Sequence, residues 1–164
     1  MLKIGVTGHR NINKKFVEEY KQQIVKKLNE LKQKHQEIII LTPLADGADR
    51  LIIYEAIKLN IKYIAILPME KNLYQEDFDI TSKTEFEYLL KNAEYIYTIL
   101  QSNPFSKNRQ YELVGRCISN SCDILFALWD GKQTGLIGGT SETVKYHINL
   151  NKDLWHLKVL RNCI

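Results

Sequence analysis

The sequence has few of the features that mark metal-binding, secreted or membrane proteins. Only three cysteines occur, Cys117, Cys122 and Cys163, and they form neither a CxxC pair nor a Cys/His set with zinc spacing. An odd number of cysteines on a chain without a signal peptide predicts reduced intracellular thiols, and no metal or cofactor is expected. The longest apolar runs, such as residues 38–41, are far too short to cross a bilayer. We therefore expect a cytoplasmic protein.

The charge of the chain is also too weakly biased to indicate a partner. The net charge is +4 at pH 7, and the lysines alternate with glutamates. No stripe of basic and aromatic residues accompanies them, so binding to nucleic acid is not expected. The length of 164 residues and the hydrophobic content of 45% are ordinary for a globular protein. Residues 1–164 are predicted to form a single domain with a substantial core.

Apolar runs alternate along the chain with segments of helical periodicity. The runs predict strands at residues 2–6, 38–41, 63–67, 95–100 and 124–128, and residues 155–160 are either an edge strand or a segment packed on the sheet. The periodic segments predict helices at about 16–31, 46–59, 86–93, 108–121 and 140–150. Strands that are apolar throughout, separated by amphipathic helices, are typical of a parallel sheet covered on both faces. We predict an α/β fold with one doubly wound, mostly parallel sheet of at least five strands.

Two turns of this predicted sheet have the composition of a ligand site. Gly138 and Gly139 precede a helix that begins near Thr140, and the first strand ends at Gly8, before His9 and Arg10. Glycine allows close approach of the backbone to a ligand, and a helix N-terminus attracts anions. Ligands of doubly wound sheets bind beyond the carboxyl ends of the strands. We therefore predict a nucleotide-like ligand, with its phosphate on residues 138–140 and its base and sugar over residues 8–10.

Each of these turns also has a purely structural interpretation. The glycines of residues 138–139 can serve a flexible loop that needs them only for its turn. Arg10 offers a fork of donors suited to a phosphate, whereas His9 is equally suited to bind the nearby backbone. Both side chains can also be merely solvated at the exit of a strand.

Several charged residues have two interpretations of this kind. Asp46 fits a helix N-cap, and Glu142 lies in the first turn of a predicted helix, where the dipole favours a carboxylate. In the functional alternative, Glu142 stabilises an oxocarbenium-like state or activates water. Glu112 and Arg116 are spaced as a solvated ion pair of a helix. Arg109, near the start of that helix, is unfavourable for the dipole unless an anion is close, which favours a ligand contact.

Three segments together resemble the SLOG superfamily of Rossmann-like domains, which is named for the Smf/DprA and Lonely Guy proteins. The segments are IGVTGHR at residues 4–10, LADGAD at 44–49, and CDILFALWDG with GGTSE at 122–131 and 138–142. The resemblance covers about residues 2–150. It implies binding of a nucleotide or a nucleotide-derived ligand. Lonely Guy enzymes release a base from a nucleoside 5′-monophosphate, other members act as ligand sensors, and the DprA branch handles single-stranded DNA.

The loop departs from the Lonely Guy pattern PGGxGTxxE. No proline precedes Gly138, Thr140 follows Gly139 directly, and Glu142 comes two residues after Thr140 instead of three. Neither Arg109 nor the arginine at position 116 stands at the spacing of the family's arginine. The resemblance therefore implies a ligand-binding loop more firmly than it implies hydrolase activity.

The leading hypothesis is a nucleotide-binding domain that hydrolyses the N-glycosidic bond of a nucleoside 5′-monophosphate, with Glu142 as the catalytic carboxylate and Glu112 as the next candidate. The first alternative is a catalytically silent sensor of a nucleotide signal, and the second is a DprA-like binder of single-stranded nucleic acid. The resemblance also implies a homodimer that pairs through helical faces, with apolar contacts from Tyr88, Tyr111 and Trp129.

Overall fold

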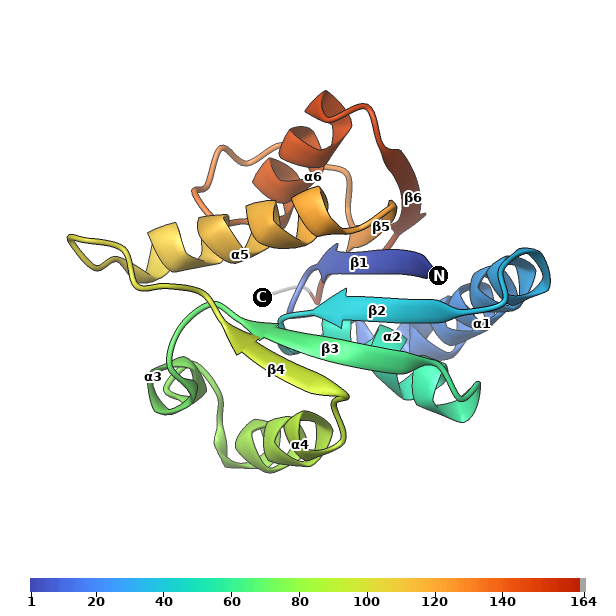
Figure 1. The fold of residues 1–164 in the computed structure, drawn as a ribbon, viewed down its shortest axis with the longest axis horizontal. Helices are drawn as coiled ribbons and strands as arrows, with labels where there is room; N and C mark the ends of the chain where they lie inside the picture. The colour runs from blue at the N-terminus through green and yellow to red at the C-terminus, as the bar shows by residue number, and fades with distance from the viewer. Residues whose placement is uncertain (163–164) are drawn as a thin grey trace.

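The computed structural model describes residues 1–162 and contains a six-stranded sheet in which all paired strands are parallel. Its strands are β1 (Leu2–Gly8), β2 (Ile38–Thr42), β3 (Lys62–Leu67), β4 (Tyr95–Thr98), β5 (Ile124–Trp129) and β6 (Asp153–Lys158). Their order across the sheet is β4-β3-β2-β1-β5-β6 (Figure 1). The predicted doubly wound α/β fold is confirmed, and the edge-strand alternative for the last segment is correct for residues 155–158, which belong to β6.

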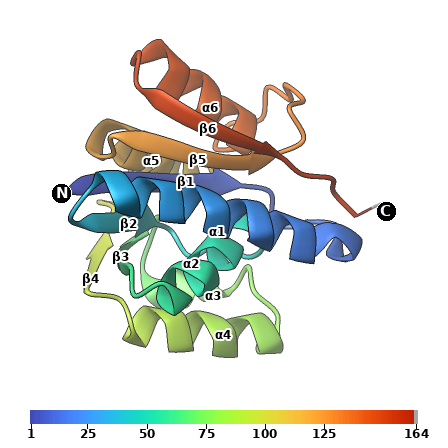
Figure 2. The ribbon, with the colours of Figure 1, turned by 90° about the vertical axis from the view of Figure 1, so that its right-hand side faces the viewer.

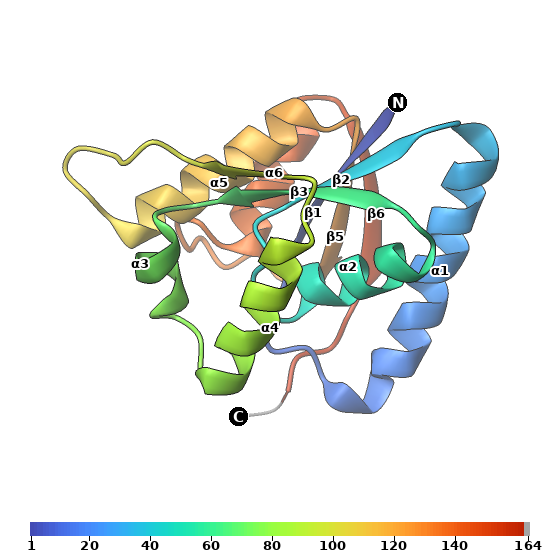
Figure 3. The same ribbon diagram turned by 60° about the horizontal axis from the view of Figure 1, so that its bottom comes forward.

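Helices cover both faces of this sheet. They are the 3₁₀ turn η1 (Lys14–Phe16) and the helices α1 (Val17–Lys34), α2 (Ala48–Lys58), α3 (Lys71–Gln75), α4 (Ile80–Lys91), α5 (Lys107–Ser121) and α6 (Thr140–Asn149). Helices α5 and α6 lie on the opposite side of the sheet from α1, α2 and α4 (Figures 2 and 3). The short α3 was not predicted, because one apolar turn gives no helical periodicity.

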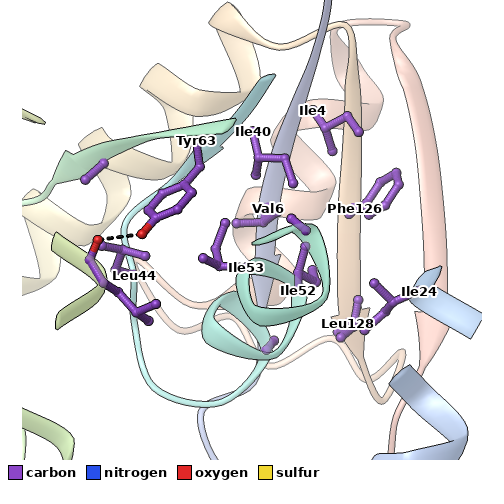
Figure 4. Packing of buried hydrophobic residues seen from close by; sticks show 14 of the residues in the cluster. Ile4, Val6, Ile24, Ile40, Leu44, Ile52, Ile53, Tyr63, Phe126 and Leu128 are labelled. Carbon is purple, nitrogen blue, oxygen red and sulfur yellow. Dashed lines mark hydrogen bonds between the residues drawn. The ribbon is translucent and has the colours of Figure 1, made fainter. Parts of the chain in front are cut away.

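Alternation along the strands divides the core between the two faces. Ile4 and Val6 of β1 pack with the residues of α1 and α2, and the larger part of the core lies on this side (Figure 4). On the other side, Val114 and Ile118 of α5 pack against Leu125 of β5. The strands are apolar throughout because each face has its own layer of helices.

Burial on α5 is wider than its apolar periodicity predicts. Val114 and Ile118 are buried, whereas the apolar Tyr111 and Cys117 of the same periodic pattern are only partly buried. The helix contacts both the sheet and α6, so a second side is covered as well; it carries the buried polar and small residues Gln110, Glu112, Gly115 and Ser119. A Cβ on Gly115 would lie 2.6 Å from Oγ1 of Thr143, which shows how closely the two helices approach.

The prediction that Trp129 supplies an apolar contact to a dimer is wrong, because this side chain is buried. It is 5% exposed because it packs with Val144 of α6 on this face of β5, and it lies against the His156 ring, with centroids 5.5 Å apart. Tyr88 remains 56% exposed and available. Cys117 and Cys122 are free thiols, and Cys163 lies outside the described residues. Within residues 1–162, no helix combines the length and apolarity that crossing a membrane would require.

Candidate functional site: a cleft where the strand order reverses

The chain builds the sheet outward from β1 in one direction and then in the other. After β2, β3 and β4 it returns to β5 on the free side of β1, where Gly8 pairs with Leu128. The connections that leave β1 and β5 therefore diverge, and such a reversal leaves a crevice at the carboxyl ends of the strands. A cleft of about 440 Å³ lies at this point, between the end of β1, the first half of α5 and the segment that leads into α6.

Both predicted turns line this one cleft. The sequence-predicted ligand residues on its walls are Gly8, His9 and Arg10 from the first turn, and Gly138, Gly139 and Thr140 from the second. The two turns are far apart in the chain and meet because β1 and β5 are neighbours in the sheet. The predicted convergence is thus a property of the fold.

The glycines of these turns differ in how strictly the surrounding structure requires a residue without a side chain. A Cβ on Gly8 would lie 2.3 Å from Cβ of Ala48 and 2.5 Å from the Leu128 carbonyl oxygen, so α2 requires a glycine there. Gly138 has φ +76°, and a Cβ on it would lie 2.7 Å from the Asn108 carbonyl oxygen. Gly139 has φ −80°, and its nearest neighbour would be 3.3 Å away. A side chain at Gly139 would need only a small shift of the loop, whereas one at Gly8 or Gly138 would collide with backbone.

The N-terminus of α6 presents free hydrogen-bond donors. Among the described residues, the backbone N–H groups of Thr140, Ser141 and Glu142 have no acceptor, and Thr143 is the first to bond back, to Gly139. The Glu142 carboxylate turns toward the loop, accepts the N–H of Gly138, and does not line the cleft. Free donors and the positive end of the helix dipole together make this turn suited to an anion.

Three basic side chains line the cleft, and Arg10 is the best placed of them. Its guanidinium carbon lies 5.4 Å from the centre of the Tyr111 ring, and within residues 1–162 it has no carboxylate partner. Lys132 and Arg161, which the sequence reasoning missed, are the others. Arg161 follows β6 and is held beside the end of β1 by a 2.9 Å bond from its Nε to Asn11, a contact that the sequence does not signal. The cleft therefore attracts anions.

His9 acts as a fixed part of the wall. Its N–H donates to Leu128 and its carbonyl accepts from Ala48, both at 3.0 Å. Its Nε2 accepts the N–H of Asp130 at 3.2 Å, which is the backbone-binding alternative of the sequence interpretation. Burial lowers the pKa of His9 and outweighs the opposing effect of the Asp130 carboxylate. The ring is therefore neutral at pH 7 and adds no charge to the cleft.

Asp46 is not the N-cap of α2 that the sequence predicted, and the nearby Asp49 lines the cleft instead. Gly47, with φ +78°, is the N-cap of α2, and this turn of the chain directs Asp46 to Arg50, 3.0 Å away, and to the Ser82 hydroxyl. Asp49 lines the cleft, is 3% exposed, and accepts the N–H of Ala45. Burial raises the pKa of Asp49 to about 7, although the Ala45 N–H and nearby arginines oppose the shift. This is the cleft's sole carboxylate among the described residues.

The remaining predicted residues form an ion cluster outside the cleft. Glu112 has a 9% exposed side chain and contacts both Arg109 and Arg116 at 2.5 Å. The expected ion pair is therefore shielded on its carboxylate side, because α6 packs beside α5. Glu112 is itself the anion that Arg109 needs near the start of α5, so the position of Arg109 gives no independent sign of a ligand.

The raised pKa of Asp49 predicts a pH-dependent stability. The stabilisation from its neutral form is complete below the ordinary carboxyl pKa of 3.8 and is lost as pH rises through about 7. Asp49→Asn stays neutral and can still accept the Ala45 N–H. We expect the free energy of unfolding of the wild type, relative to Asp49→Asn, to fall by about 1–3 kcal/mol between about pH 5 and about pH 8. Denaturant titrations at several pH values measure this, and parallel profiles would contradict it.

No protein-family model and no curated protein matches the chain. Solved structures do. DNA processing protein A (DprA) from Streptococcus pneumoniae matches with a TM-score of 0.68 and 16% identity, over 95% of this chain and 50% of that one. A structure of DprA from Helicobacter pylori, solved for its single-stranded DNA binding mode, matches with a TM-score of 0.63 and 18% identity, over 94% and 64%. The structural-genomics target TM1055 matches with a TM-score of 0.58 and 16% identity, over 94% and 72%.

These likenesses concern the fold. The chain spans half the length of the Streptococcus pneumoniae protein and less than two thirds of the Helicobacter pylori one. At least 94% of the present chain is nevertheless covered in each of the three superpositions. The chain therefore shares the Rossmann-like α/β fold of these structures.

Proposed function

We propose that the cleft binds a nucleotide or a nucleotide-derived ligand through its phosphate. The observation that carries the proposal is the convergence of the two glycine turns at the reversal of strand order, where Arg10 has no carboxylate partner among residues 1–162. Doubly wound sheets bind ligands at this position. The likeness of the fold to SLOG-type proteins supports the same class of ligand.

In the proposed complex, the phosphate lies against the free N–H groups of residues 140–142. Arg10 supplies a charge-assisted fork from the opposite turn, and Lys132 and Arg161 add positive charge to the same cleft. The sugar and base lie over residues 8–10, beside the ring of Tyr111. The volume of about 440 Å³ falls within the range of roughly 300–1,000 Å³ that is usual for small-molecule sites.

A panel of ligands tests the binding directly. The thermal stability of the protein is measured with AMP, GMP, CMP, UMP and inorganic phosphate. A ligand at a hundredfold excess over its Kd stabilises the folded state by about 2.7 kcal/mol. We expect at least one nucleoside monophosphate to raise the melting temperature more than inorganic phosphate does. A panel without any shift would overturn the proposal.

The finer proposal is release of the base from a bound nucleoside 5′-monophosphate. Glu142 lies in the right turn for this, but its carboxylate accepts the Gly138 N–H, and neither Glu142 nor Glu112 lines the cleft. Asp49 does line it and is partly protonated near pH 7. The geometry therefore favours the silent sensor over an enzyme that depends on Glu142.

Glu142→Gln separates these alternatives. If Glu142 faces a developing cation during turnover, loss of its charge removes most of the base release and keeps binding. We expect instead a sensor's result, with no free base from the wild type and a stability change of less than about 1 kcal/mol in the variant. Chromatography of the products after incubation with nucleoside monophosphates detects free base. Turnover in the wild type that Glu142→Gln abolishes would contradict our expectation and establish the enzyme.

Binding of single-stranded DNA is the second candidate. The likeness to the Helicobacter pylori protein, whose structure describes a single-stranded DNA binding mode, favours it. Arg10, Lys132 and Arg161 are spaced around one cleft and are suited to contact successive phosphates. Titration of a short oligothymidylate at several salt concentrations tests this candidate. Affinity that falls steeply with salt and is lost on mutation of Arg10 would support it.

A further inference from the structure

A second cavity, of about 540 Å³, adjoins the cleft at Arg10, which lines both. Its walls come from η1, from the N-terminal half of α2 and from the beginning of α4. The side chains with hydrogen-bonding groups on these walls include Asp46, Tyr54, Asp79, Thr81 and Glu85. The mononucleotide complex proposed for the first cleft does not use this second space.

Arg50 makes the wall of the second cavity rigid. Its side chain is 3% exposed, and its Nη1 donates to the Ser82 hydroxyl at 2.9 Å and to Glu85 at 2.7 Å. Its Nε donates to the Leu44 carbonyl at 3.0 Å, so the arginine ties α2 to α4 and to the end of β2. Nη2 of Arg50 is buried and has no hydrogen-bond partner among the described residues. The guanidinium lies over the Phe78 ring, with its central carbon 4.7 Å from the ring centre, so this part of the wall is closed.

The two cavities differ in charge. The first has basic residues and one carboxylate, Asp49, that burial leaves partly protonated near pH 7. The second has Asp46, Asp79 and Glu85 beside its basic residues. Carboxylates repel a phosphate, but they accept hydrogen bonds from sugar hydroxyls and from the amino groups of bases. The first cavity is thus suited to a phosphate and the second to the uncharged, donor-rich part of a ligand.

We propose that the second cavity binds the second nucleoside of a dinucleotide, with Arg10 at the phosphate that joins the two halves. This inference rests on the proposed nucleotide binding in the first cleft. Each cavity alone has the volume of a small-molecule site, about 300–1,000 Å³, so together they exceed what a mononucleotide fills. The ligand is a molecule with two nucleosides linked through phosphate, either by a pyrophosphate or by a 3′–5′ phosphodiester.

Calorimetric titration of the wild type with AMP, with 5′-phosphorylated diadenylate and with diadenosine pyrophosphate tests the proposal. We expect at least one dinucleotide to bind at least tenfold more tightly than AMP, and the tighter of the two identifies the linkage. Thr81→Trp introduces a large side chain at an exposed position of the second cavity. It should remove the tenfold advantage of the dinucleotide and leave the affinity for AMP unchanged.

Thr84→Trp is the matched control, because Thr84 is also exposed on α4 but lines neither cavity. It should preserve all three affinities. Lys14→Trp narrows the second cavity from η1, so the test remains valid if one variant fails to fold. Dinucleotides that bind no more tightly than AMP, or a loss of AMP affinity in both cavity variants, would overturn the second subsite. Failure of every nucleotide to bind the wild type would instead overturn the proposed function itself.

Discussion

Replacement of Arg10 by glutamine should weaken the binding of AMP by about 10- to 100-fold, because a charge-assisted hydrogen bond contributes roughly 1.5–3 kcal/mol. Arg10 is exposed, it has no carboxylate partner among residues 1–162, and it lines the cleft opposite the free N–H groups of α6. Glutamine keeps a polar side chain but loses both the charge and the planar fork that suits a phosphate. Since no ion pair is broken, the free energy of unfolding should change by less than about 1 kcal/mol.

Titration calorimetry measures the affinity, and a denaturant titration measures the stability. Arg116→Gln is the matched control: Arg116 is an arginine of similar exposure on α5 that pairs with Glu112 and lines neither cavity. It should bind AMP as the wild type does. Equal affinity in the Arg10 variant and the control would move the phosphate away from the end of β1 and would leave the α6 turn as the remaining anion site.

Gly8→Ala should lower the free energy of unfolding by about 3 kcal/mol, the upper end of the usual cost of overpacking, because the site is rigid. The added Cβ would lie 2.3 Å from Cβ of Ala48 and 2.5 Å from the Leu128 carbonyl oxygen. The second neighbour is backbone in the middle of the sheet and cannot move without disturbing β5. For a chain of this size, the loss corresponds to a melting temperature about 6–12 °C lower.

Two further variants test the cause of this loss. Gly139→Ala meets its nearest neighbour only at 3.3 Å and has a negative φ, so it should cost less than about 1 kcal/mol. Ala48→Gly removes one of the two close neighbours of the new Cβ. The double variant Gly8→Ala with Ala48→Gly should therefore lose less stability than the sum of the single variants. Strict additivity, or a stable Gly8→Ala, would show that α2 does not constrain the end of β1.

Much of the fold could be predicted from the sequence, because its main signals are local. Ile38 to Leu41 read as a buried strand because four apolar residues in a row fit a sheet that is covered on both faces. Both glycine turns were predicted as ligand sites on the same basis, from the strands and helices beside them. The purposes of the individual glycines could not be predicted, because the close neighbours of Gly8 and Gly138 belong to α2, β5 and α5.

The contacts of the charged residues could not be predicted from their neighbours in the sequence. Asp46 had the residue type of an N-cap, but its carboxylate contacts Arg50 and Ser82, and Ser82 comes from a helix much later in the chain. Glu112 had the spacing of a solvated ion pair, but the packing of α6 shields it. Arg161 had no signal at all, and only the return of the chain after β6 brings it to the cleft.

The sequence by itself determined the class of fold and the two strand ends that carry ligand-binding composition. Periodicity and turn chemistry depend only on residues that are neighbours in the sequence, so they can be recognised without knowledge of the tertiary structure. The tertiary structure alone decided that Arg10 lies between two cavities without a carboxylate partner among residues 1–162, and that burial shifts the pKa of Asp49 to about 7. Pairing, burial and cavity shape depend on distances between residues remote in sequence, and the order of the strands sets those distances.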